Sequence, residues 1–422
     1  MANRTRDAGL HHHGAHHPAL QSAAQVIGRC VAIDETTALV GSDSGAIHPE
    51  DLGDVVVWYD RLDRHDHVDI DAGCVLDRAG DHQVGLGSLR EVGVHVDQDP
   101  TAGPRIRHNP AMHELTEITA GLRFPEGPIA MPDGSVILVE MFGPRLTRVS
   151  PTGEKETIAD IAGGPNGTAI GPDGALYLCN NGGCFTPVDL GGLLLPGPHD
   201  PSRYIGGRVQ RVDLSTGAVT DLYDECDGRP LRAPNDLVFD AHGGFWFTDH
   251  GIRDGEARTS DLTSIYYAKA DGSYISEQVH PVEAPNGIGL SPDGSTLYWA
   301  ETFTGRVFRR TIAAPGELAP AAPLDPSVCL AGLPGYQLLD SLGIDGDGNV
   351  CVATLVNGGI TIISPDGASI SHLPTGDLLT TNICFGDRDG SGEYRDAYIT
   401  ASATGKLLHT RWEHRGLRLN YL

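Results

Sequence analysis

Six residues with a side-chain oxygen recur at equivalent points of the sequence. Each is followed eight positions later by a glycine, and in five of the six copies an aspartate stands directly before that glycine. We call these residues the anchors: Glu126, Asn166, Asn235, Asn286, Asp340 and Asn382. Turn preference alone explains the asparagines, but it explains Glu126 poorly and does not require an oxygen in every copy. The repetition therefore indicates a set of oxygen ligands.

Ligands of this kind suit a hard cation. The anchors offer two carboxylates and four amides, with no Cys or His among them. This set favours one divalent metal ion, with Ca²⁺ as the first expectation and Mg²⁺, Mn²⁺ or Zn²⁺ as alternatives. Two carboxylates that meet in a closed channel repel each other, so a cation or a proton must neutralise them.

The sequence around each anchor indicates the elements that would position it. A short strand begins at the anchor, an Asp-Gly turn follows, and a second apolar strand comes next. Residues 112–422 divided among six copies give about 52 residues each, the size of a four-stranded propeller blade. The pattern predicts an all-β fold, a six-bladed β-propeller over residues 112–422, whose rotational symmetry brings the anchors to a central channel. A β-sandwich would not explain the sixfold repetition.

Residues 1–111 have a different composition. They contain no Phe and no Lys, one Trp and one Tyr, but 11 of the 19 His. A segment so poor in large apolar residues can bury little surface against its ordering entropy. We expect a poorly structured extension here. The favoured interpretation is a start at Met112 with spurious sequence before it, and a genuine disordered extension is the alternative.

Charge and composition exclude several classes of partner. The formal net charge of −26 argues against nucleic acid and anionic membranes, which need a basic surface. No apolar run approaches the roughly 20 residues of a membrane span. The eight cysteines include no CxxC pair, and no signal peptide is evident. These features favour a cytoplasmic protein with reduced thiols, and they specify no oligomeric state.

Four segments resemble a known family. They are Phe124–Pro128, Arg232–Asp236, Pro285–Gly287 and Asp340–Asp345. In this order they are similar to the family of senescence marker protein 30 (SMP-30), gluconolactonase and luciferin-regenerating enzyme, over roughly residues 115–415. The resemblance implies a six-bladed propeller, a divalent metal held by Glu126, Asn286 and Asp340, and a catalytic role for Asp340. It also places Asn235 near the substrate. We expect Arg232 and Asn166 to contact the substrate as well.

The resemblance implies hydrolysis of a small lactone. The metal would act as Lewis acid and Asp340 as general base. Arg253 stands where sugar-lactone enzymes of the family carry an acidic residue, so the sequence does not specify a sugar lactone. The insertion Pro187–Tyr204 is expected at the channel mouth, where its apolar run Gly191–Pro198 would fit a less polar lactone, and a surface loop between strands is the alternative. The alternatives are a metal-dependent aryl-ester or phosphotriester hydrolase, and a noncatalytic binding scaffold with a structural cation. No G-x-S-x-G motif supports a serine esterase.

Overall fold

The computed structural model describes residues 107–108 and 114–422. The chain divides by its contacts into residues 1–96 and 97–422, and all described residues belong to the second unit. The predicted N-terminal extension lies outside the described residues except for Arg107–His108. These two residues form strand β1, whose backbone pairs in parallel with strand β29 (Ile370–Pro374).

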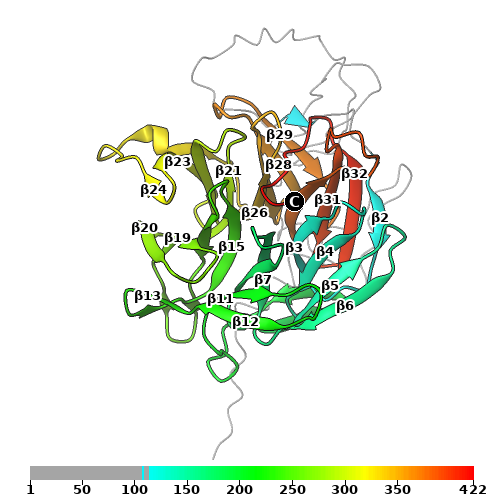
Figure 1. The fold of residues 1–422 in the computed structure, drawn as a ribbon, viewed down its shortest axis with the longest axis horizontal. Helices are drawn as coiled ribbons and strands as arrows, with labels where there is room; N and C mark the ends of the chain where they lie inside the picture. The colour runs from blue at the N-terminus through cyan, green and yellow to red at the C-terminus, as the bar shows by residue number, and fades with distance from the viewer. Residues whose placement is uncertain (1–106, 109–113) are drawn as a thin grey trace, which may run out of the picture. The chain divides into compact units, whose positions relative to one another are not determined.

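Six inner strands surround a central channel. They are β3 (Pro125–Ala130), β7 (Pro165–Ile170), β15 (Pro234–Phe239), β21 (Pro285–Leu290), β26 (Leu338–Ile344) and β30 (Thr380–Gly386). Each inner strand packs against the inner strands of both neighbouring sheets, and β30 returns to β3, so the ring is closed. Figure 1 shows these strands around the centre of the view. The predicted six-bladed β-propeller is confirmed.

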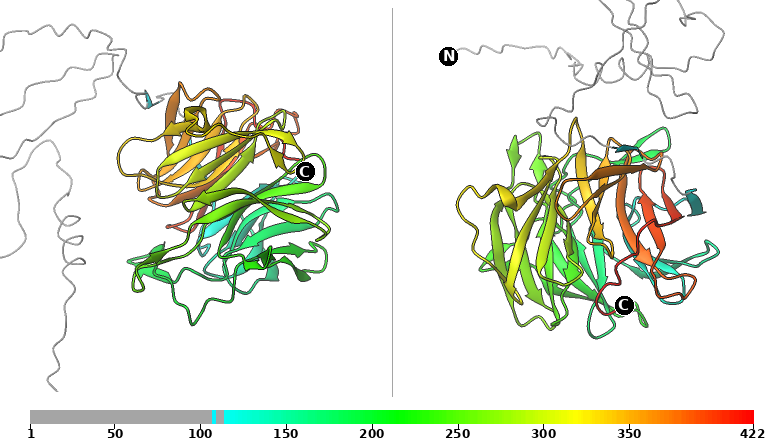
Figure 2. Two further views of the ribbon diagram at one scale, coloured as in Figure 1. Left: turned by 90° about the vertical axis from the view of Figure 1, so that its left-hand side faces the viewer. Right: turned by 90° about the horizontal axis from the view of Figure 1, so that it is seen from above.

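Each inner strand is the first strand of an antiparallel sheet that forms one blade, and the blades are numbered 1 to 6 in the chain order of their inner strands. The second strands are β4 (Val136–Glu140), β8 (Leu176–Asn180), β16 (Gly244–Asp249), β22 (Thr296–Glu301), β27 (Val350–Leu355) and β31 (Asp396–Ala401). The third strands are β5 (Arg145–Val149), β11 (Arg208–Val212), β19 (Thr263–Lys269), β23 (Arg306–Ala314), β28 (Gly359–Ile363) and β32 (Lys406–Arg411). The outer strands of five blades are β6 (Lys155–Asp160), β12 (Val219–Tyr223), β20 (Ile275–Val282), β29 (Ile370–Pro374) and β2 (Thr116–Thr119). The side views in Figure 2 show how these sheets are arranged around the propeller.

Blade 4 departs from this pattern at its outer edge. Strand β25 (Cys329–Gly332) pairs with the first part of β23, at Arg306–Phe308. Strand β24 (Glu317–Leu318) pairs with its last part, at Ile312–Ala314. The outer position of this blade is therefore divided between two short strands.

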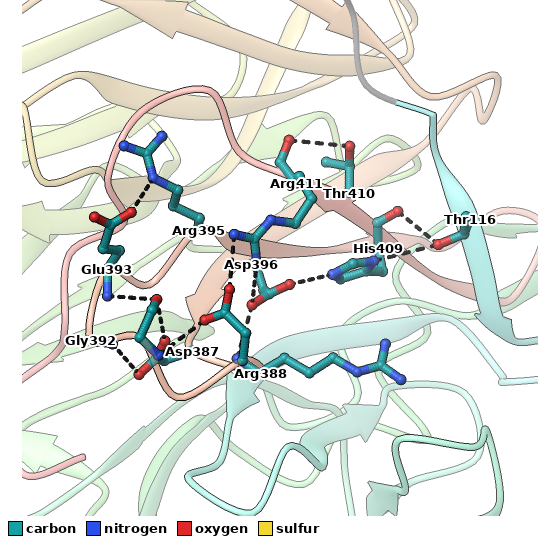
Figure 3. Close-up of polar contacts among 12 residues, drawn as sticks. Thr116, Asp387, Arg388, Gly392, Glu393, Arg395, Asp396, His409, Thr410 and Arg411 are labelled. Carbon is teal, nitrogen blue, oxygen red and sulfur yellow. Dashed lines mark hydrogen bonds and ion pairs between the residues drawn. The ribbon is translucent and has the colours of Figure 1, made fainter.

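Blade 6 joins the two ends of the propeller. Its first three strands come from the end of the chain, and β2 from the start of the described fold completes the sheet by pairing antiparallel with β32. The hydroxyl of Thr116 donates to the carbonyl of His409 at 3.2 Å. The buried carboxylate of Asp396 accepts from His409 Nε2 at 2.8 Å and from Arg411 Nη1 at 3.2 Å (Figure 3). These contacts hold the closing strands in register.

The apolar core lies between neighbouring sheets. The first two strands of most blades are almost wholly buried, and Trp246, Tyr177 and Tyr398 are among the largest buried side chains. The described part of the chain contains one 3₁₀ turn, Pro326–Val328, and no helix long and apolar enough to cross a bilayer. Three short hairpins extend from the loops: β9 (Pro187–Leu190) with β10 (Leu193–Pro196), β13 (Glu225–Cys226) with β14 (Arg229–Pro230), and β17 (Arg253–Asp254) with β18 (Thr259–Ser260).

Candidate active site

Every anchor lies at a β-bulge. On β3, Glu126 pairs with Val139 and Ile129 pairs with Ile137, so β3 contains one more residue than β4 over this stretch. The register of β7, β15, β21 and β26 shifts by one residue across the anchor, and in β30 the shift falls directly before Asn382. A bulge bends the strand and redirects a side chain that would otherwise follow the regular alternation. The sixfold repeat thus includes a repeated backbone irregularity at the candidate site.

Buried polar side chains fix the segments that lead into three of the bulges. Glu140, Asn180 and Asp249 end the second strands of blades 1, 2 and 3. Each accepts hydrogen bonds, at 2.7–2.9 Å, from main-chain N–H groups one or two residues before its inner strand. Because a buried N–H without a partner is costly, these bonds hold the segment in one conformation.

All six anchors are buried, with 2–8% of their surface exposed. Burial and the neighbouring Asp340 carboxyl raise the pKa of Glu126 well above its ordinary value. Burial likewise raises the pKa of Asp340 to about 7, while a bond from Asn286 opposes the shift. The structure therefore brings Glu126, Asn286 and Asp340, the three predicted metal ligands, into one interacting group.

A third carboxyl belongs to this group and was missed from the sequence. Asp236 follows the anchor Asn235, is buried, and raises the pKa of both Glu126 and Asp340. Burial raises the pKa of Asp236 itself to about 7. The sequence does mark Asp236 as unusual, because the residue that follows the anchor is glycine in three other copies and aspartate only in this one.

Two of the four amide anchors supply oxygens that no protein group satisfies. Asn166 Oδ1 and Asn235 Oδ1 are buried, and neither has a hydrogen-bond partner. Because buried polar atoms are nearly always paired, two such oxygens in one channel indicate a missing ligand that accepts electron pairs. Oxygens from carboxylates and amides are the donors that a hard divalent cation prefers. The residues present thus fit such a cation.

The carboxyl groups alone do not form a metal cluster. Within residues 107–108 and 114–422, no group of three or more His, Cys, Asp or Glu side chains is arranged to hold a metal. A cation at this centre would therefore depend on the amide oxygens as well as on Glu126 and Asp340.

Arg232 lies at the edge of the site. Its guanidinium forms an ion pair with Asp261 at 2.8 Å, and 44% of the side chain is exposed. Its main-chain N–H donates to Asp249 at 2.7 Å. The side chain is therefore partly exposed and separate from the buried anchors.

The channel end at which the inner strands begin, here called the upper mouth, is rimmed by apolar and aromatic side chains. The loops after the second strands of blades 2, 3 and 4 carry Phe185, His250 and Phe303. The ring centroid of His250 lies 6.0 Å from that of Phe185 and 5.8 Å from that of Phe303. Burial lowers the pKa of His250 to about 4, so its ring is neutral at physiological pH. Arg253 stacks on Phe303, with 3.3 Å from its guanidinium carbon to the ring centroid.

The hairpin β9–β10, inserted in blade 2, reaches the same mouth. Leu194 and Leu195 pack with Phe124, which directly precedes β3, and with Met141, which directly follows β4. The N–H of Leu194 donates to the carbonyl of Ala403 in blade 6 at 2.9 Å. The insertion thus lies where the sequence analysis expected it, and its apolar residues face the mouth.

The opposite end of the channel contains a cavity of about 260 Å³, here called the lower cavity. Its walls are mostly the apolar residues of the inner strands of blades 3 to 6, and Asp236 and Asn382 also line it. Residues 417–420 of the chain end cover it, and Asn420 Nδ2 donates to the carbonyl of Phe239 at 2.9 Å. Figure 1 places the C-terminus near the centre of the ring.

The fold and the site together define a six-bladed propeller with a buried, oxygen-rich centre beneath an apolar mouth. The sequence pattern of the SMP-30/gluconolactonase/LRE-like family matches residues 124–403, well over half of the chain. The chain belongs to this family, and the resemblance noted from the anchor segments is confirmed.

Several characterised proteins are similar to this chain. The lactonase drp35 of Staphylococcus epidermidis is 26% identical over 244 residues, which cover 57% of this chain and 66%, just under two thirds, of that protein. A gluconolactonase of Xanthomonas campestris has a similar structure, with a TM-score of 0.56 and 20% identity over 74% of this chain and 95% of that one. Regucalcin of Agrobacterium tumefaciens, described as a calcium-binding protein, gives a TM-score of 0.53 and 19% identity over 71% and 95%. The two structural likenesses support the fold.

Proposed function

We propose that this protein is a metal-dependent lactonase that opens a small lactone by hydrolysis. The observation that carries the proposal is the buried group of Glu126, Asn286 and Asp340, which interact and lie in one channel with two unsatisfied amide oxygens. Buried carboxyls without basic partners are expected at a reactive or cation-binding centre, because elsewhere they only destabilise a fold. A noncatalytic scaffold would not require them.

Glu126, Asn286 and Asp340 would hold one divalent cation, with Ca²⁺ as the first candidate. When bound, the cation would polarise the lactone carbonyl and stabilise the charge that develops on its oxygen. The similarity to a calcium-binding propeller supports this choice of metal. The carboxyls of Glu126 and Asp340 must both be ionised to serve as ligands.

Asp340 would act as the general base. A water molecule attacks the carbonyl carbon, and Asp340 accepts the proton that this water loses. The ring C–O bond then breaks, and the proton returns to the departing oxygen, which leaves a hydroxy acid as product. Burial raises the pKa of Asp340 to about 7 in the metal-free site, and a bound cation would favour the ionised carboxylate, which is the form that accepts a proton.

The upper mouth would receive the substrate. Asn235 and Asn166 lie at the buried centre, while Arg232 is at the rim, so the amides would contact the reacting end of the lactone. Phe185, His250 and Phe303 would then contact the rest of the ring. Their apolar character supports a less hydroxylated substrate than a sugar lactone.

A cytoplasmic location is part of the proposal. All six cysteines in the described part of the chain are free, and five of them are buried. Free, buried thiols are typical of proteins in a reducing compartment.

A hydrolysis assay tests the function. The full chain would be assayed with a panel of lactones before and after chelation, and again after addition of Ca²⁺, Mg²⁺, Mn²⁺ or Zn²⁺. We expect turnover to be lost on chelation and restored by at least one cation. Full activity in protein shown by elemental analysis to be metal-free would contradict the metal mechanism, and activity on aryl esters or phosphotriesters alone would favour that class of substrate.

A further inference from the structure

The divided outer strand of blade 4 leaves a hollow of about 370 Å³. It lies beside the middle of β23, between the segments that pair with β24 and β25. Its lining includes two arginines, Arg309 and Arg310, together with Thr296, Tyr298, Ser327 and one acidic residue, Asp325. Its volume falls within the ~300–1,000 Å³ typical of small-molecule sites.

Arg309 behaves differently from its equivalents in other blades. Arg148 of blade 1 and Arg211 of blade 2 occupy the same position on the third strand as Arg309 does in blade 4. In each blade, the arginine pairs with a residue of the second strand, and that residue pairs in turn with the inner-strand residue three places after the anchor. Each forms an ion pair with the aspartate of its own Asp-Gly turn: Arg148 with Asp133 at 3.0 Å, and Arg211 with Asp173 at 2.7 Å.

In blade 4 this ion pair is absent, although the aspartate is present. Asp293 instead accepts bonds from the neighbouring Ser291 and Ser295. Arg309 turns to main-chain carbonyls, donating to Ser327 at 3.1 Å and to Pro365 at 2.7 Å. Arg309 therefore forms no ion pair there, although its charge helps to lower the pKa of the exposed Asp366 carboxyl.

Arg310 is held in a similar way. It donates to the carbonyl of Ala319 at 2.6 Å, and Ala319 also lines the hollow. Neither Arg309 nor Arg310 forms an ion pair within the part of the chain that the structure describes. The one carboxylate of the lining, Asp325, accepts from the N–H of Ser327 at 2.9 Å. The hollow thus carries two positive charges and one negative charge in a chain of net charge −26.

We propose that this hollow binds a phosphate group, carried either by free phosphate or by a small phosphate monoester. An arginine has five N–H donors, and the carbonyl bonds leave several of them unused on both side chains. Guanidinium groups bind phosphate oxygens with paired, charge-assisted bonds, and nearby hydroxyls can donate to the remaining oxygens. The two carbonyl-bound guanidiniums are held ready for such a ligand.

The test is calorimetric titration of the full chain with inorganic phosphate and, separately, with glycerol phosphate at low ionic strength. The protein is first treated with chelator and desalted, so that no channel metal can hold the phosphate. We expect saturable binding that weakens as salt is added. Tighter binding of the monoester would assign the site to a phosphorylated metabolite, and selective binding of inorganic phosphate would assign it to the free anion.

Three variants and one matched control locate the binding. Arg309→Ala and Arg310→Ala should each weaken it by about 10-fold or more, the loss of a hydrogen bond to a charged group. Asp325→Asn, which keeps the side-chain oxygen that accepts from the N–H of Ser327, should strengthen it by about 2–5-fold. Arg211→Ala, equivalent to Arg309 but ion-paired, should leave it unchanged. Absence of saturable binding up to about 10 mM ligand, or binding that Arg309→Ala and Arg310→Ala leave intact, would overturn the proposal.

Discussion

The main-chain N–H of Leu194 donates to the carbonyl of Ala403 at 2.9 Å, which ties a hairpin of blade 2 to blade 6. The register of the hairpin explains why this N–H is available. Leu190 and Leu193 close a two-residue turn, so the next pair, Asp189 with Leu194, is a pair without mutual hydrogen bonds. The polar backbone of Leu194 therefore faces away from its own hairpin and toward the propeller.

Leu194→Pro should loosen the hairpin from the mouth without disturbing the hairpin itself. Proline has no N–H, so the bond to Ala403 is lost, while the β9–β10 ladder does not use that donor. We expect KM for the preferred lactone to rise by about 2–10-fold, the effect of one hydrogen bond. The melting temperature should be unchanged. Leu190→Ser, at a position 59% exposed near the hairpin turn, is the control and should alter neither quantity.

Asp340→Asn should separate chemistry from folding. The amide keeps the size and one oxygen of the carboxylate but cannot accept a proton, so turnover should fall by roughly 10²–10⁴ at saturating metal. Cation binding, measured by calorimetry, should be weaker but present. Asn382→Ala is the matched control, because its side-chain oxygen already accepts from the N–H of Ile383 at 2.7 Å. Turnover of Asp340→Asn within a few-fold of the wild type would remove Asp340 from the role of base.

Metal affinity should depend on pH through the buried carboxyls. Burial raises the pKa of Asp340 from its ordinary 3.8 to about 7, so below pH 7 a cation must displace a proton. Affinity should therefore rise with pH in this range, by about tenfold per pH unit for each displaced proton. Calorimetric titrations with Ca²⁺ at several pH values would measure this. A pH-independent affinity between about pH 5 and pH 7 would contradict the shift.

The same shift affects the stability of the metal-free protein with the opposite sign. The folded state holds the proton of Asp340 more tightly than the unfolded state, so this contribution to stability is complete below about pH 4 and is lost as pH rises through about 7. The difference in melting temperature between wild type and Asp340→Asn, both freed of metal, should follow that window.

Gly167→Ala should destabilise the ring of inner strands. A Cβ at this position would lie 2.3 Å from Asp236 Oδ1 and 2.5 Å from its Cα, and backbone atoms cannot move aside easily. We expect a loss of about 1–3 kcal/mol in the free energy of unfolding, measured with urea. Gly255→Ala, where nothing lies within 4 Å of the added carbon, should change stability by less than about 0.5 kcal/mol.

The sixfold architecture could be predicted because its signals are local. The glycine of the turn stands eight residues after the anchor in every copy, and each copy specifies one hairpin without reference to the others. The grouping of Glu126, Asn286 and Asp340 followed from rotational symmetry and from the family resemblance. The bulges beneath the anchors could not be predicted in the same way, since they appear only in the pairing of two strands.

The rest of the site depends on departures from the repeat. Asp236 differs from the glycine of other copies, and its importance comes from the proximity of Glu126 and Asp340 in other blades. The divided outer strand of blade 4 and the pairing of Arg107–His108 with β29 involve segments that have no counterpart in the other blades, as far as the structure describes them. Such long-range pairings carry no periodic signal, so only the structure shows them.

The closure of blade 6 has a consequence for synthesis of the protein. Thr116 lies 293 residues before its partner His409, so β2 leaves the ribosome long before the strand that it must pair with. At about 5–20 residues per second, the interval is on the order of 15–60 s. During that time the propeller is not closed, so the edge of β2 and the apolar faces of the completed blades remain exposed. Exposed strand edges favour aggregation. The nascent chain should thus depend most on chaperones just before its final strand is made.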